Sequence, residues 1–122
     1  MLAPQIESIL LLTGLATAGA LLLSLAPVRM SKLIFGRPPA DALGIVIVRH
    51  WGLLVGLVGA LIVYSAYHAE VRLPTLIVAI AEKAAFALGM FLSPSRRRPI
   101  ILVLALADAG MAVIYLVYLI GF

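Results

Sequence analysis

The chain has 122 residues, of which 65% are hydrophobic and 11% charged, and its mean hydropathy is +1.23. A water-soluble domain of this length needs more polar side chains to cover its surface, so the composition excludes a soluble fold and predicts an integral membrane protein. The absence of cysteine excludes disulfides and thiolate chemistry. The formal net charge of +4 comes from short basic loops rather than from one basic face, so no nucleic-acid partner is expected.

Four apolar segments are long enough to cross the hydrocarbon core of a bilayer, which takes about 20 helical residues. The first carries Glu7 at its start instead of the basic segment of a signal peptide, so a transmembrane helix is expected there. Short loops make the last three segments consecutive antiparallel neighbours. The sequence therefore predicts a single membrane domain (1–122), an all-α antiparallel bundle of four transmembrane helices. The spans are expected at residues 7–26, 43–67, 75–92 and 100–120.

The longest connection, over residues 27–42, contains an amphipathic segment at 30–35, where we expect a short helical turn at headgroup level. Most of the loop bases lie in this connection and in the one at 93–99, whereas the remaining connection carries only Arg72. The positive-inside rule therefore predicts that both basic loops are cytoplasmic and that both termini lie on the opposite side. The expected localisation is the bacterial inner membrane.

Five ionisable residues fall inside the predicted spans, where an unpaired charge costs several kcal/mol: Arg49, His50, Glu82, Lys83 and Asp108. At about 1.5 Å per residue, all five are within reach of one layer of the membrane. We expect a buried cluster in which Lys83 pairs with Asp108, and Glu82 with Arg49 or His50, although the exchanged pairs fit equally well. The cluster either fixes helix register or supplies a catalytic site or a proton path.

Small residues repeated along each span predict which helix faces point inward, because they let helices approach closely. Hydroxyls beside such residues on the first span can bond to their own helix or to a neighbour. The expected inward positions are Gly14 and Ala18 with Thr13 and Thr17, then Gly52, Gly56 and Ala60 continuing from Arg49, then Ala81, Ala85 and Gly89, and finally Ala105, Ala109 and Ala112.

Aromatic side chains supply the candidate ligand-binding residues Trp51, Tyr64 and Tyr115. The tyrosines are typical of an interfacial belt at the non-cytoplasmic end. Alternatively, Tyr64 and Tyr115 form the upper wall of a cavity above the carboxylates. His50 and His68 are about 27 Å apart along one helix, so neither a metal site nor a cofactor is expected.

The order of these features resembles that of small four-helix membrane proteins of the DoxX-like superfamily, over nearly the whole chain. Arg49-His50-Trp51-Gly52 opens the second span, Glu82-Lys83 lies inside the third and Asp108 inside the fourth. The resemblance implies a compact four-helix bundle. It also implies links with membrane redox systems or with accessory roles for other membrane proteins, and it transfers no catalytic motif residue by residue.

Three functions fit the sequence. The leading hypothesis is a small accessory or ligand-binding membrane protein, acting as a homo-oligomer or as a subunit of a larger complex, because four helices enclose little room for a solute route. The second is an intramembrane isomerase, cyclase or redox enzyme acting on a lipophilic substrate. In that enzyme Glu82 or Asp108 is the acid or base, and Arg49 or Lys83 stabilises charge. The third is an oligomeric proton or ion pathway through Glu82, Asp108 and His50.

Overall fold

The structure of the protein, a computed structural model, describes residues 2–121, and this part of the chain is helical with no strand. Four of its segments are long and apolar enough to cross a membrane, which confirms the predicted all-α four-helix membrane fold. In chain order the elements are η1 (Ala3–Gln5), α1 (Ile6–Ala18), α2 (Leu21–Leu25), α3 (Pro27–Phe35), α4 (Ala42–Tyr67), η2 (Ala69–Val71), α5 (Arg72–Phe91), η3 (Pro94–Arg97) and α6 (Pro99–Leu119).

The first span, predicted over residues 7–26, corresponds to the apolar helical segment Ala3–Leu25, which the structure divides into two helices. The chain turns at Gly19 and Ala20, between α1 and α2. Glycine is a poor helix former, and the turn lets α2 continue along α4. The backbones approach closely there, because a Cβ at Gly52 would lie 2.8 Å from the carbonyl oxygen of Ala20.

Glycines on α4 form the contact with α1 and α2. Gly52 and Gly56 are buried as predicted, but Ala60 and Arg49 are exposed, and Gly59 takes the inward position instead. A Cβ at Gly59 would overlap the backbone of α1. The prediction for Ala60 failed because each step of four residues moves the position about 40° around the helix. A straight line of contact residues must therefore combine steps of four with steps of three.

The inward face of α5 also differs from the prediction. Ala81, Ala85 and Gly89 are exposed, whereas Ala79, Lys83 and Ala87 are buried. Lipid is as apolar as the protein interior, so small residues alone do not fix the rotation of a helix, and burial of the lysine does. On α6 the prediction holds, because Ala105 and Ala112 are buried and Ala109 is half-buried.

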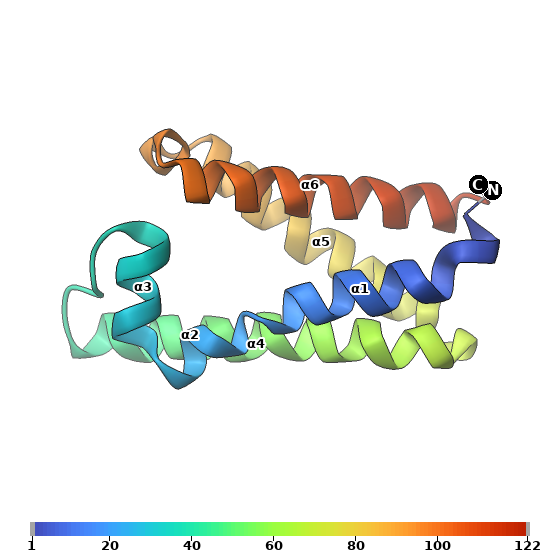
Figure 1. Ribbon diagram of the computed structural model, residues 1–122, viewed down its shortest axis with the longest axis horizontal. Helices are drawn as coiled ribbons and strands as arrows, with labels where there is room; N and C mark the ends of the chain where they lie inside the picture. Colours follow the sequence, from blue (N-terminus) through green and yellow to red (C-terminus); the bar gives the residue numbers. More distant parts are fainter. Residues whose placement is uncertain (1, 122) are drawn as a thin grey trace.

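The two ends of the bundle are built differently (Figure 1). At the end that holds both termini, α1, α4, α5 and α6 share a core that includes Leu10, Ile62, Leu76 and Tyr115. At the other end α6 stands away from α2 and α4, and α3 lies between them, in contact with α4 and α6. The helix α3 therefore stands where the short amphipathic turn was predicted. Both basic connections lie at the same end of the bundle as α3.

A guanidinium group holds α3 against the start of α6. Arg98 donates hydrogen bonds from Nε to the carbonyl oxygen of Ile34 at 2.7 Å and from Nη2 to that of Leu33 at 3.0 Å. These are carbonyls of the last turn of α3, which have no partner within the helix. The contact fixes the end of α3 beside the cavity described next.

Candidate functional site: a polar cavity beside α3

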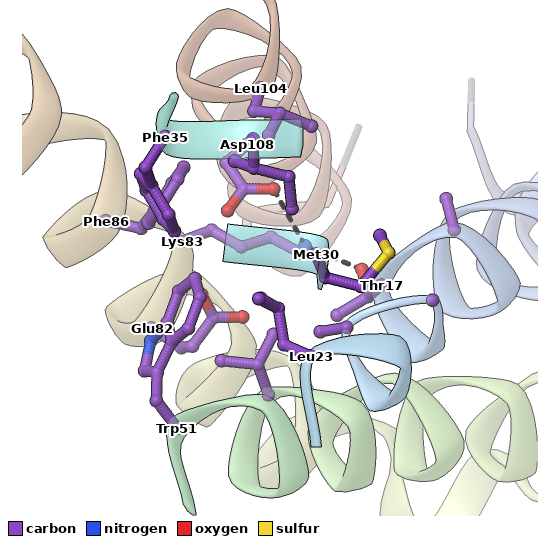
Figure 2. Close-up of a pocket in the computed structure, with 15 residues that line it drawn as sticks. Thr17, Leu23, Met30, Phe35, Trp51, Glu82, Lys83, Phe86, Leu104 and Asp108 are labelled. Atoms are coloured by element: carbon purple, nitrogen blue, oxygen red, sulfur yellow. Dashed lines mark hydrogen bonds and ion pairs between the residues drawn. The ribbon is translucent and has the colours of Figure 1, made fainter. Parts of the chain in front are cut away.

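A cavity of about 190 Å³ lies where α3 separates the two sides of the bundle. It is lined by residues of α1 to α6, together with the turn at Gly19 and Ala20. Four lining side chains are polar, three are aromatic and the others are aliphatic or small (Figure 2). The polar set is Thr17, Glu82, Lys83 and Asp108, and the aromatic set is Phe35, Trp51 and Phe86.

Lys83 stands at the centre of the polar wall and is only 1% exposed. Its Nζ lies 3.2 Å from Oδ1 of Asp108 and 2.7 Å from Oγ1 of Thr17, so it joins α5 to both α6 and α1 (Figure 2). The predicted ion pair between Lys83 and Asp108 is present. The Thr17 hydroxyl was predicted to bond either to its own helix or to a neighbouring one, and it does both. It accepts from Lys83 of α5 and donates to the carbonyl oxygen of Thr13 in α1 at 2.8 Å.

Glu82 is half-buried, and its Oε1 is buried without a hydrogen-bond partner among the described residues. Figure 2 shows its carboxyl group on the opposite side of the Lys83 chain from Asp108. The predicted partners Arg49 and His50 are exposed and do not line the cavity, so the prediction that pairs Glu82 with either of them is wrong. Their segment of α4 lies at the end of the bundle where α6 stands away from it, so fewer helices cover it.

Only Trp51 of the three candidate ligand-binding aromatics lines the cavity. Tyr115 is fully buried in the core, where its hydroxyl donates to Oγ1 of Thr13, so its position braces α6 against α1. Tyr64 is exposed on α4 and stacks on His68, with 3.9 Å between ring centroids. The alternative of a cavity wall formed by both tyrosines is therefore wrong.

Trp51 belongs to an aromatic cluster drawn from three helices. Its ring stacks on Phe86 of α5 at 5.7 Å and meets Phe35 of α3 at 6.4 Å between centroids. All three rings also line a second hollow, a groove of about 590 Å³ between α4 and α5. The cluster Trp51, Phe35 and Phe86, which we name the aromatic neck, thus stands between the cavity and the groove.

The polar wall presents two carboxyl groups and one ammonium group. Their formal charges sum to −1 when both carboxyl groups are ionised and to zero when one is protonated. Lys83 is occupied by Asp108 and Thr17, whereas Oε1 of Glu82 is an acceptor with no donor. Within residues 2–121 no three His, Cys, Asp or Glu side chains are grouped to hold a metal ion. The cavity is therefore suited to a molecule that donates a hydrogen bond.

Comparison of the chain with protein-family models, curated proteins and solved structures finds no match. The resemblance to the DoxX-like superfamily stays a prediction.

Proposed function

We propose that this protein binds a small lipophilic molecule within the membrane, with the polar end of that molecule in the cavity of Thr17, Glu82, Lys83 and Asp108. The observation that carries the proposal is the unpaired Oε1 of Glu82 in the wall of an open cavity. Buried polar atoms normally have a partner, and an unpaired one costs about 1–3 kcal/mol. A ligand hydroxyl or amine would remove that cost.

The size and the lining of the cavity support the same proposal. An apolar protein cavity of about 150 Å³ binds benzene, so a cavity of about 190 Å³ has room for a ring-sized group. A salt bridge that served only to fix helix register would need no such space around it. Most lining residues are apolar, which is typical of small-molecule sites that orient a ligand with few polar groups.

Solvent extraction and mass spectrometry of the protein purified from membranes in mild detergent would test the proposal. Ala16 lines the cavity, and Ala60 is exposed on α4 outside it. We expect one lipophilic compound to co-purify near stoichiometrically with the wild type and with Ala60→Phe, and to be lost from Ala16→Phe. Equal recovery of every compound from both variants would show only surface lipid and would contradict the proposal.

The same cavity favours a second candidate, an intramembrane enzyme acting on a lipophilic substrate, because Glu82, Lys83 and Asp108 line one space. Glu82 would be the acid or base and Lys83 would stabilise developing charge. In that case Glu82→Gln, which cannot transfer the proton, should retain a compound that differs chemically from the one in the wild type. Identical compounds in both proteins would favour simple binding.

We also propose that the end with α3 and η3 faces the cytoplasm of a bacterial cell. The bases of both connections at that end support this orientation through the positive-inside rule. Because the chain has no cysteine, single substitutions report topology directly. Arg37→Cys should resist an impermeant thiol reagent in intact cells and Glu70→Cys should react, and the reverse pattern would overturn the orientation.

A further inference from the structure

The cavity and the groove between α4 and α5 meet at Glu82, which lines both. Among the described residues that line the groove, Glu82 is the only ionisable one. Leu54 and Ile47, which also line the groove, are 49% and 58% exposed, so the groove opens on the outer surface of the bundle. In a membrane that surface is in contact with lipid chains.

The aromatic neck forms part of the wall of both hollows. Trp51, Phe35 and Phe86 come from three different helices, and each of them lines the cavity as well as the groove. The rings contact one another at 5.7 and 6.4 Å between centroids, and flat apolar rings are favourable neighbours for a hydrocarbon chain. A chain attached to a head group in the cavity would therefore meet apolar rings at the boundary with the groove, where side-chain rotation of these rings would admit it.

The charges of the cavity restrict the head group. With both carboxyl groups ionised the cavity carries a formal charge of −1, and its ammonium group already has two partners, so an anionic head such as a phosphate or a carboxylate would be repelled. The unpaired Oε1 of Glu82 requires a donor, which a hydroxyl or an amine supplies. Hydroxyl and amine heads share this chemistry.

We infer that the ligand is a single-chain amphiphile whose hydroxyl or amine head donates a hydrogen bond to Glu82 in the cavity and whose hydrocarbon chain passes the aromatic neck into the groove between α4 and α5. This inference rests on the proposed function and adds the class of ligand and the position of its chain.

Trp51 makes the inference directly measurable, because it is the only tryptophan of the chain. The experiment uses the protein in nanodiscs of unbrominated phosphatidylcholine, titrated with 6-bromododecan-1-ol, 6-bromododecan-1-amine or the short 6-bromohexan-1-ol, so that the bromine lies at the same distance from the head group in every probe. Bromine quenches tryptophan fluorescence on contact, and unbrominated dodecanol separates saturable binding from partition into the bilayer. We expect saturable quenching that dodecanol reverses.

Two glycines provide a matched pair of variants. A Cβ at Gly89 or at Gly110 meets no atom within 4 Å, so both positions accept a side chain without a clash, but only Gly89 lines the groove. Gly89→Leu should weaken binding of the dodecyl probes about tenfold, equivalent to about 1.4 kcal/mol, because it occupies the space of the chain. Binding of the hexyl probe by Gly89→Leu, and binding of every probe by Gly110→Leu, should match the wild type.

The outcomes separate the inference from the proposed function. Glu82→Met, which removes the acceptor without leaving a charge, should weaken both chain lengths at least tenfold. If no probe binds saturably, the proposed function fails. If the probes bind but chain length and Gly89→Leu have no effect, or if 6-bromododecanoic acid binds as tightly as the alcohol, the inference is overturned while the proposed function stands.

Discussion

Removing Asp108 should leave the buried ammonium group of Lys83 without its carboxylate partner. The lysine is 1% exposed and the aspartate side chain 20%, and in Asp108→Leu the hydrogen bond to Thr17 is the one that remains for Nζ among residues 2–121. Breaking one side of a buried ion pair costs about 3–5 kcal/mol, and a lysine at the centre of a membrane helix costs about 2.5–3.5 kcal/mol. We therefore expect the free energy of unfolding to fall by about 3 kcal/mol.

Reversible unfolding by SDS in mixed micelles, followed by circular dichroism, measures this change. The double variant of Lys83→Met and Asp108→Leu should regain stability to within about 1 kcal/mol of the wild type, because an apolar pair replaces an ion pair at little cost. Glu70→Gln, at an exposed carboxylate in η2, should stay within about 0.5 kcal/mol. A loss below about 0.5 kcal/mol for Asp108→Leu, or no recovery in the double variant, would refute the reasoning.

Three further changes test how the helices are held. Gly59→Ala should lower the free energy of unfolding by about 1–3 kcal/mol, because its Cβ overlaps α1. Gly110→Ala should raise the free energy of unfolding by about 0.5–1 kcal/mol. Equal effects of the two variants in the SDS titration would contradict the close contact at Gly59. Arg72→Ala should cost about 1–3 kcal/mol in the same titration, since two carbonyls at the end of α4 lose guanidinium bonds of 2.7 and 2.8 Å, and an unchanged value would show that water replaces them. Arg98→Ala should speed amide hydrogen exchange in α3, unlike Arg97→Ala, and equal protection in both variants would mean that α3 is held otherwise.

Much of the architecture is readable from the sequence because lipid imposes strict demands. A spanning segment must be a helix of fixed minimum length, so hydropathy reveals the spans. A charge in lipid must have a partner, so Lys83 and Asp108, placed at similar depth on neighbouring helices, were predicted to pair and do pair.

Helix rotation and the limits of the cluster were harder to predict. The small size of Ala81, Ala85 and Gly89 predicts that they face inward, yet they are exposed. The prediction fails because lipid and protein interior do not differ in polarity. Depth and the spacing of three residues from Gly52 both predict an inward Arg49, but the structure leaves it exposed. The unpaired oxygen of Glu82 and the aromatic neck depend on contacts among three helices, which no local pattern encodes.

A crystal structure grown from a lipid mesophase tests the central claim most directly, because it shows what fills the cavity between Glu82 and the Lys83–Asp108 pair. We predict elongated density whose polar end lies within hydrogen-bond distance of Oε1 of Glu82 and whose chain continues past Trp51. A cavity closed by side chains, or one that holds only ordered water against Glu82, would contradict the proposal that this protein binds a lipophilic molecule.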